Sequence, residues 1–365
     1  MKKKILSLFL VCMVLAGCGS TEANYTSTKV EISENPIRPS TDYASGSVNT
    51  STNSAKTDTP KKEKEDATAN TNTNTGEGKP KIWFINNANG VGFSAALTNS
   101  MESALNISDY DYKFIDGQGE QQVQIDAVED AIAENVDCIA LDPIKEEGFE
   151  DTLKKAKDAG IKIVLIDRQI SDESLFDAWL GSDFLLEGQN AAKWLVETKG
   201  EEEEQKVVIL EGDRGSSAAI GRTNGFKDTI ANYSNYEIIA SESADFDKAK
   251  GKALMKDYLS QYKDIDVIVS QNDEMTYGVL EALEEDGKDA KDYTIITFDG
   301  QADVFKEMIN GKVDLCVECN PLLGPDSAAL VAKVLAGENV DKINYVEEGV
   351  FPAEVASEEI GNRTF

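Results

Sequence analysis

From residue 81 onward, short apolar runs alternate with amphipathic stretches, and short polar connections separate them. The apolar runs have the length of buried β-strands, whereas the amphipathic stretches have the periodicity of helices. We predict strands at 82–85, 112–115, 136–141, 161–166 and 178–180, followed by a second series at 207–210, 237–240, 267–270, 294–298 and 314–317. The helices predicted between them include 121–135, 149–159, 187–197, 248–262 and 275–284. Regular alternation of strand and helix predicts parallel sheets covered on both faces, so two such series predict an α/β protein with two similar Rossmann-like lobes and a cleft between them.

Polar side chains follow three of the predicted strands, at the point where each strand ends. Asp167 and Arg168 follow the strand at 161–166, Asn272 comes just after 267–270, and Asp299 follows 294–298. In open parallel sheets, ligands bind outside the carboxyl ends of the strands. Carboxylates, a guanidinium and an amide together supply the acceptors and donors that a polyhydroxylated molecule needs. The pattern therefore predicts a receptor for a small polar ligand.

Each of these residues also has a purely structural interpretation. Asn272 could only cap the helix that follows it, and Asp299 with Gly300 could only form a turn. Asp167 and Arg168 could pair with each other or with a neighbouring helix end. Three such positions at equivalent places in the strand pattern favour ligand binding.

Two phenylalanines are candidates for the walls of the same site. Phe246 lies between charged residues in the segment 244–248, which suits an exposed ring better than a core residue, and Phe93 begins a helical stretch. Sugars present C–H faces that pack on aromatic rings. We therefore expect both rings to contact a sugar.

The N-terminus predicts export and a lipid anchor. Three lysines and the apolar run 5–16 form a secretory signal whose hydrophobic stretch is too short to span a bilayer. It ends in Leu-Ala-Gly-Cys at 15–18, which resembles the lipobox of bacterial lipoproteins, so residues 1–17 are expected to be removed and Cys18 to be lipidated. The alternative is a plain secretory signal.

Residues 18–78 are rich in Ser, Thr and Asn with almost no apolar periodicity, which predicts a disordered spacer and suits a Gram-positive cell surface.

Composition excludes several classes of function. The formal net charge is −31 with no basic stripe, so nucleic acid is not an expected partner. The chain contains no histidine, which removes the usual catalytic triads and most metal-dependent hydrolysis, so neither an enzyme nor a metal site is expected. Asp167 and Asp299 leave a paired-carboxylate glycosidase open in principle. Cys316 and Cys319 lie three apart, and residues three apart on a strand point to opposite faces, so we expect free or buried thiols.

One glycine motif resembles a dinucleotide fingerprint. Gly90-Val-Gly92-Phe-Ser-Ala follows a strand, and Asp116 lies further along the chain. Four residues separate the strand from the first glycine, whereas the fingerprint needs the turn at the strand end. We therefore expect a ligand-facing loop and no cofactor.

The ordered motifs resemble those of type I periplasmic sugar-binding proteins of the ribose and galactofuranose group. They are Ile166-Asp-Arg168, Ala219-Ile-Gly-Arg222 ahead of Gly225-Phe226, Ser243-Ala-Asp-Phe246, Gln271-Asn-Asp-Glu-Met275, Phe298-Asp-Gly300, and the run from Val317 to Pro325. The resemblance implies the binding component of a carbohydrate ABC importer, with a monosaccharide and the importer's permease as partners. A receptor that presents a sugar to a membrane kinase or chemoreceptor is an open alternative. Galactofuranose-type relatives often carry Trp-Arg where this chain has Phe93-Ser94, and Asp where it has Gly221, so the sugar stays open.

The resemblance also implies roles and boundaries for particular residues. Sugar hydroxyls would bond to Asp167, Arg168, Arg222, Asn272 and Asp299, the sugar faces would stack on Phe93 and Phe246, and Asn89 and Glu318 would contribute from the first loop and the hinge. The chain would pass between lobes near 181–186, 318–321 and 342–346. The N-terminal lobe would comprise 79–184 with 320–344, and the C-terminal lobe 185–319 with 345–365. We expect an extracytoplasmic monomer, tethered to the outer face of the membrane, whose lobes close on the ligand by a hinge.

Overall fold

The computed structural model of the chain describes residues 78–106 and 110–365. The predicted signal peptide, Cys18 and the predicted spacer up to residue 77 lie outside the described residues. Among the helices of the described part, none is both long and apolar enough to cross a membrane.

Ten of the strands form two sheets with the same internal order, as the two predicted series require. The first sheet contains β1 (Lys81–Ile85), β2 (Asp111–Ile115), β3 (Cys138–Leu141), β4 (Lys162–Ile166) and β5 (Ala178–Gly181). The second contains β6 (Gln205–Glu211), β7 (Tyr236–Ser243), β8 (Val267–Ser270), β9 (Thr294–Asp299) and β10 (Leu315–Glu318). Their orders are β2-β1-β3-β4-β5 and β7-β6-β8-β9-β10, and every pairing among these strands is parallel. Each sheet is therefore doubly wound, with its switch point beside its first strand.

The sequence pattern did not predict the two short strands that complete the sheets. β11 (Ile343–Tyr345) pairs in parallel with β5 at the edge of the first sheet. β12 (Val350–Pro352) pairs antiparallel with β10 at the edge of the second. Each has three partly exposed residues, too few to show a period of two.

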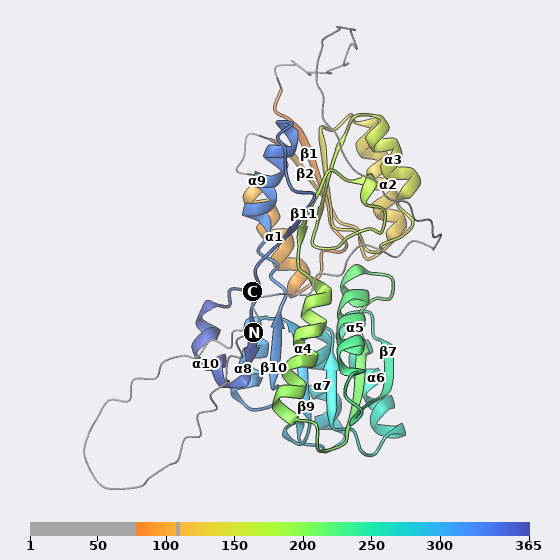
Figure 1. Ribbon diagram of the computed structural model, residues 1–365. Helices are drawn as coiled ribbons and strands as arrows, with labels where there is room; N and C mark the ends of the chain where they lie inside the picture. The colour runs from red at the N-terminus through yellow and green to blue at the C-terminus, as the bar shows by residue number, and fades with distance from the viewer. Residues whose placement is uncertain (1–77, 107–109) are drawn as a thin grey trace, which may run out of the picture. The chain divides into compact units, whose positions relative to one another are not determined.

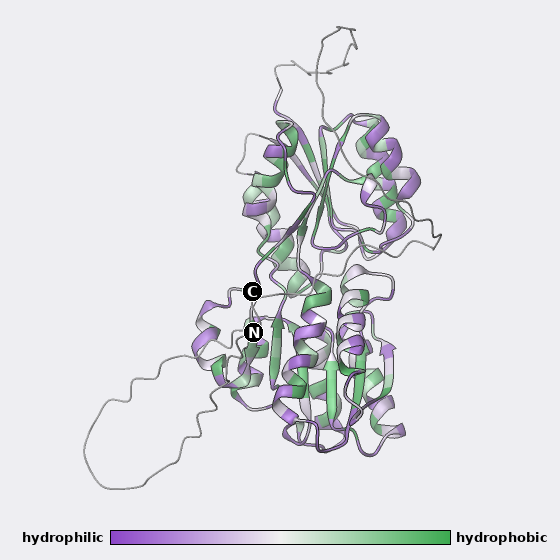
Figure 2. Ribbon diagram, in the orientation of Figure 1, coloured by the Kyte–Doolittle hydropathy of each residue, from purple (hydrophilic) through white to green (hydrophobic). Residues whose placement is uncertain are grey.

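Alternate residues of each strand face opposite layers of helices. In the first sheet, Ile82 and Phe84 pack toward α1 (Phe93–Asn106) and α9 (Gly324–Leu335), whereas Trp83 and Ile85 pack toward α2 (Gln121–Ala133) and α3 (Glu150–Asp158). Figure 1 shows these two helix pairs on opposite faces of the sheet, and Figure 2 shows the mostly hydrophobic strands between them. Burial of both faces explains why the strands read as continuous apolar runs.

The second sheet is covered in the same way. Val207 and Ile209 pack toward α4 (Phe184–Lys199) and α5 (Ser217–Ile230). Val208 and Leu210 pack toward α6 (Lys248–Gln261), α7 (Asp273–Glu285), α8 (Ala302–Ile309) and the short α10 (Ala356–Glu359). The expected α/β fold with two Rossmann-like lobes is confirmed.

The described chain passes between the two sheets three times. The first passage runs from β5 to α4, the second from β10 to α9, and the third from β11 to β12. The third covers residues 346–349, slightly later than the expected 342–346, because β11 still pairs with the first sheet up to Tyr345. Three passages between two lobes are the connection expected of a hinge.

Candidate ligand-binding site

A cavity of about 480 Å³ collects side chains from the carboxyl ends of strands in both sheets. Seven of the predicted site residues line it: Phe93, Asp167, Arg168, Arg222, Phe246, Asn272 and Asp299. Its volume is in the range of small-molecule sites. The structure therefore brings together residues that are far apart in the sequence, at the edge where doubly wound sheets bind ligands.

Asp167 and Arg168 line this cavity, and each has a buried polar atom without a hydrogen-bond partner among the described residues. Asp167 directly follows β4 and is 3% exposed, and its Oδ1 atom has no partner among the described residues. Arg168 Nη1 donates to the Ile144 carbonyl at 3.3 Å. Its Nε atom is buried with no hydrogen-bond partner in the described part of the chain and lies 4.0 Å from Asp167 Oδ2. The two side chains are thus a loose pair with an acceptor and a donor to spare. Burial raises the pKa of the Asp167 carboxyl to about 6, although Arg168 and Arg222 act to lower it.

Arg222 is held from three sides at the wall of the cavity. It is 3% exposed, and its Nε atom donates to Glu187 Oε2 at 2.6 Å. Its Nη1 atom donates to the Gln271 carbonyl, and its Nη2 atom lies 3.4 Å from Asp299 Oδ1. Because the guanidinium is fixed by these partners, its position is set before any ligand arrives.

Asp299 closes β9 in an unusual backbone conformation. Its φ is 101° and that of Gly300 is 99°. The carboxylate of Asp273 holds this turn, accepting hydrogen bonds from the backbone N–H of Gly300 at 3.0 Å and of Gln301 at 2.7 Å. Asp299 and Gly300 therefore do form a turn, and the turn places the Asp299 carboxylate in the cavity lining.

Asn272 caps α7 and lines the cavity at the same time. Its Oδ1 atom accepts from the Met275 N–H at 2.9 Å, which is the N-cap interaction. Its Nδ2 atom lies 3.4 Å from the Phe246 carbonyl, a long contact for a hydrogen bond. The capping role is present, and the amide nitrogen is left with donor capacity for a ligand.

Aromatic rings cover the remaining wall. Phe93, Phe184 and Phe246 all line the cavity and belong to one apolar cluster. Phe246 has a φ of 57°, and a Cβ atom at Gly212 would lie 1.9 Å from its ring, so only glycine leaves room for the ring there. The Arg168 guanidinium lies 5.4 Å from the centre of the same ring. The result is a pocket with flat apolar walls and polar groups at its ends.

The pattern that defines the periplasmic binding protein domain matches residues 82–339 of the chain. The chain belongs to the periplasmic binding protein family. The expected resemblance to the type I sugar-binding members of that family is confirmed. Galactofuranose-binding protein YtfQ of Escherichia coli (strain K12) is 36% identical over 277 residues, which cover 74% of this chain and 86% of YtfQ. Ribose import binding protein RbsB of Bacillus subtilis (strain 168) is 31% identical over 229 residues, which cover 62% of this chain and 72% of RbsB.

Solved structures give the same assignment. A Mycobacterium smegmatis protein in complex with β-D-fucofuranose superposes with a TM-score of 0.75 at 34% identity, covering 78% of this chain and 94% of that protein. The binding protein of the arabinose ABC transporter from Shewanella sp. ANA-3, bound to α- and β-L-arabinofuranose, superposes with a TM-score of 0.74 at 34% identity, covering 78% and 95%.

Two predicted site residues of this periplasmic binding protein do not line the cavity. Asn89 is exposed, and its backbone N–H donates to Asp116 Oδ1 at 2.8 Å, whereas its neighbours Ala88 and Gly90 do line the cavity. Glu318 turns toward the hinge, where its carboxylate binds Arg363 and accepts from the Gly349 N–H at 2.7 Å. Their direct contact with a ligand stays a prediction.

Sequence reasoning missed several charged groups around the site. Asp142 directly follows β3 and is 1% exposed, so it carries the same strand-end signal that singled out Asp167. Glu187 and Asp273 lie in the first turns of α4 and α7, where an acidic residue is ordinary, and nothing in the pattern marks them. Burial raises the pKa of Glu187 to about 7 and that of Asp273 to about 7.

The described cysteines of this periplasmic binding protein are free thiols, as expected. Cys138, Cys316 and Cys319 are all buried and unpaired. Cys316 lies in β10 and Cys319 just beyond its end, where it lines the cavity. The Cys316–Cys319 spacing therefore marks a strand and its exit rather than a disulfide.

Proposed function

We propose that this chain is the extracytoplasmic substrate-binding lipoprotein of a carbohydrate ABC importer and binds a monosaccharide between its two lobes. The observation that carries this proposal is the pairing of open polar positions with aromatic walls. Among the residues that the structure describes, Asp167 Oδ1 and Arg168 Nε are buried beside the cavity without hydrogen-bond partners, and Phe93 and Phe246 line the cavity. A sugar would satisfy the polar atoms with its hydroxyls and cover the rings with its C–H faces.

The charges around the cavity favour a neutral sugar. The acidic residues among its lining are Asp167, Asp213, Asp245, Asp247, Glu274 and Asp299, and the basic ones are Arg168, Arg222 and Lys250. An excess of carboxylates would repel a phosphorylated or acidic sugar. Relatives with this fold are described with β-D-fucofuranose and L-arabinofuranose, and the most informative sequence relatives are named for galactofuranose and ribose. We therefore place the ligand among neutral pentoses and hexoses that reach a furanose form.

The rest of the proposal follows from the N-terminal motif and the family. Cys18 of the lipobox-like motif would carry the lipid, and the segment up to residue 77 would link it to the lobes. The closed, sugar-loaded lobes would then dock on the importer's permease at the membrane surface, with the binding protein as a monomer. Binding rather than catalysis is supported by the absence of histidine from the chain and by relatives named as binding proteins.

A thermal-shift screen tests the proposal directly. The full chain is heated with D-galactose, L-arabinose, D-ribose, D-fucose and D-fructose, and with their phosphate esters as charged controls. A neutral ligand present at about 100 times its Kd should stabilise the folded state by about 2.7 kcal/mol and raise the Tm. Isothermal titration calorimetry then gives the stoichiometry. The proposal fails if no neutral sugar raises the Tm, or if only the phosphate esters do.

A further inference from the structure

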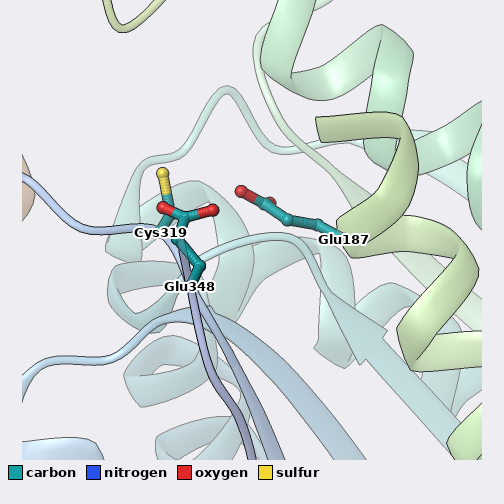
Figure 3. Close-up of side chains that lie close together, drawn as sticks. All are labelled: Glu187, Cys319 and Glu348. Carbon is teal, nitrogen blue, oxygen red and sulfur yellow. The ribbon is translucent and has the colours of Figure 1, made fainter. Parts of the chain in front are cut away.

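Two glutamates and a cysteine meet beside the cavity, where the chain passes between its two sheets. Glu187 lies in the first turn of α4, Cys319 follows β10, and Glu348 lies between β11 and β12. Oxygen and sulfur atoms of the three lie within 4.8 Å of one another, and Glu187 and Cys319 are 3% and 2% exposed. Figure 3 shows the carboxyl groups of Glu187 and Glu348 pointing toward each other. The second and third passages thus contribute Cys319 and Glu348 to this cluster, and Glu187 lies just beyond the first passage.

One oxygen of this cluster lacks a donor. Glu187 Oε2 accepts from Arg222 Nε at 2.6 Å, but Glu187 Oε1 is buried and has no partner among the described residues. The Oε1 atom of Glu348, by contrast, accepts from Ser182 Oγ at 2.6 Å and from the Asn320 N–H at 2.7 Å. Leaving a buried carboxylate oxygen without a donor is costly, so we expect Glu187 Oε1 to have a hydrogen-bond donor.

We propose that Glu187 and Glu348 share one proton, held between Glu187 Oε1 and the second oxygen of Glu348, and that this pair positions Arg222 in the site. The proton supplies the missing donor. It also leaves the pair with a single negative charge beside the guanidinium of Arg222, which lies close to the Asp299 carboxylate as well. Glu187 is buried and Glu348 beside it is half-buried, and two adjacent carboxylates cannot both ionise in such a place without strong repulsion, so sharing a proton is the ordinary solution.

The surroundings of both carboxyl groups favour the protonated pair. Burial, with smaller contributions from Asp167 and Asp183, raises the pKa of Glu187 to about 7, although Arg222 acts to lower it. Burial also raises the pKa of Glu348 well above its usual range, and Glu187 and Glu318 add to the effect. The titratable and charged groups that face the pair are Asp167 beyond β4, Asp183 before α4, Arg222 on α5, Asp299 at the end of β9, Glu318 on β10, and Cys319. Arg222 is the single cation in this set.

A metal ion fits the cluster less well than a proton. Zn²⁺ accepts cysteine and carboxylate ligands but takes four of them at about 2.0–2.3 Å. Here Arg222 occupies one oxygen of Glu187, and two donors occupy one oxygen of Glu348. The guanidinium also places a positive charge against the ligand that a metal would need.

The pH dependence of stability in the sugar-free protein tests the shared proton. The folded pair holds a proton that an unfolded glutamate, with its ordinary pKa of 4.5, has released at neutral pH. Its contribution to stability is therefore full below about pH 4.5 and is lost as the pH rises through about 7. Glu348→Gln replaces the shared proton with a permanent amide donor. Between about pH 4.5 and pH 8, the Tm of Glu348→Gln should fall less than that of the wild type, because the other buried carboxyl groups, Asp167 and Asp273 among them, still titrate in both proteins.

Control variants distinguish the effect of this shared proton on stability from the effects of other acidic residues and of a bound metal. Glu347→Gln changes the exposed neighbour and should reproduce the wild-type pH profile. Glu187→Gln removes the other carboxyl group of the pair, and it should also flatten the dependence of Tm on pH. Equal pH profiles for wild type, Glu348→Gln and Glu187→Gln would overturn the proposal. A rise in the Tm of EDTA-treated wild type on adding Zn²⁺, absent in Glu348→Gln, would replace the proton with a metal site.

The proposed positioning of Arg222 rests on the proposed sugar site, so it is tested by a second measurement, the pH dependence of sugar affinity. If a sugar from the screen binds, its affinity for the wild type should weaken above about pH 7, and this dependence should be reduced in Glu348→Gln. An affinity profile that Glu348→Gln leaves unchanged would refute the link to Arg222. Because the stability profile needs no sugar, failure of the sugar screen would leave the shared proton itself still tested.

Discussion

At the scale of single residues, the lining of the cavity gathers unusual backbone conformations. Asp167, Asp245, Phe246 and Asp299 have φ angles of 62°, 53°, 57° and 101°, in a region that residues other than glycine seldom adopt. All four line the cavity, whereas the other two such residues in the described chain, Gln118 and Asn135, do not. Each costs about 1–3 kcal/mol, and such conformations gather at functional sites, so their concentration in one place supports the proposed ligand site.

Removing either side chain of the Asp167–Arg168 pair should weaken sugar binding without unfolding the protein. Asp167→Ala or Arg168→Ala leaves the partner and the ligand hydroxyl unsatisfied, which we expect to cost about 2–4 kcal/mol, roughly 30- to 1000-fold in Kd. Isothermal titration calorimetry with the sugar found by the screen measures the change. Lys154→Ala, which removes an exposed lysine paired with Asp158, is the control and should bind like the wild type. Unchanged affinity in both site variants would refute their role.

The two roles of Asn272, helix cap and ligand-binding amide, tolerate different substitutions. Serine caps a helix about as well as asparagine, so Asn272→Ser should change the Tm of the sugar-free protein by only a few degrees. Serine is too short to replace the amide donor, so the same variant should lose about tenfold or more in sugar affinity, or about 1.4 kcal/mol. Thermal unfolding and calorimetry on one preparation separate the two roles. A lowered Tm with full affinity would make Asn272 purely structural.

The strand-end rule identified most of the polar site from the sequence but could not complete it. Asp167, Asn272 and Asp299 each follow an apolar run, and the fold brings them to one cavity. Asp142 obeys the same rule and was overlooked. Glu187 could not be found this way, because its role depends on the distance between α4 and α5, which no local pattern encodes.

At the scale of secondary-structure elements, glycines set that distance. A Cβ atom at Gly225 of α5 would lie 2.1 Å from the Leu185 carbonyl oxygen, and one at Gly188 of α4 would lie 2.3 Å from the Arg222 carbonyl oxygen. The two helix backbones therefore approach more closely than any side chain allows. This approach lets Glu187 reach the Arg222 guanidinium at 2.6 Å.

Gly225→Ala should force the two helices apart. The added methyl group meets backbone rather than a flexible side chain, so we expect a loss of about 1–3 kcal/mol in the free energy of unfolding. Denaturant unfolding measures this loss, and calorimetry should show weaker sugar binding because Arg222 moves with its helix. Gly361→Ala adds the same methyl group where nothing lies within 4 Å, and its stability should match the wild type. Equal stabilities for the two variants would contradict the close-contact interpretation.

Element order was predictable along the chain, whereas the connections between lobes were not. The ten longer strands are predicted from the sequence because each is a buried apolar run. β11 and β12 are three residues each and become strands only because sheet edges offer them partners. The expected crossing points accordingly came from the family resemblance rather than from periodicity.

At the scale of the whole molecule, backbone and side-chain contacts cross from one lobe to the other near the mouth of the cavity. The Glu146 N–H donates to the Gly215 carbonyl at 2.8 Å, and the Gln169 N–H donates to Ser217 Oγ at 2.9 Å. Lys145 also forms an ion pair with Asp213. Contacts of this kind hold the two lobes together around a bound molecule, which suits a carrier that must hand its sugar to a membrane partner.

At the same scale, the proposed lipid anchor depends on Cys18 of the lipobox-like motif. Cys18→Ala should abolish lipid attachment, so the protein should be secreted into the medium or remain as an unprocessed precursor. Cell fractionation, Triton X-114 partitioning and mass spectrometry of the N-terminus measure the outcome. Cys12→Ala, which changes the other cysteine of the signal region, should leave the protein anchored. Because Cys18 is far from the cavity in sequence, the secreted Cys18→Ala protein should bind its sugar with wild-type affinity. Retention of fully processed Cys18→Ala protein in the membrane fraction would exclude the lipid anchor.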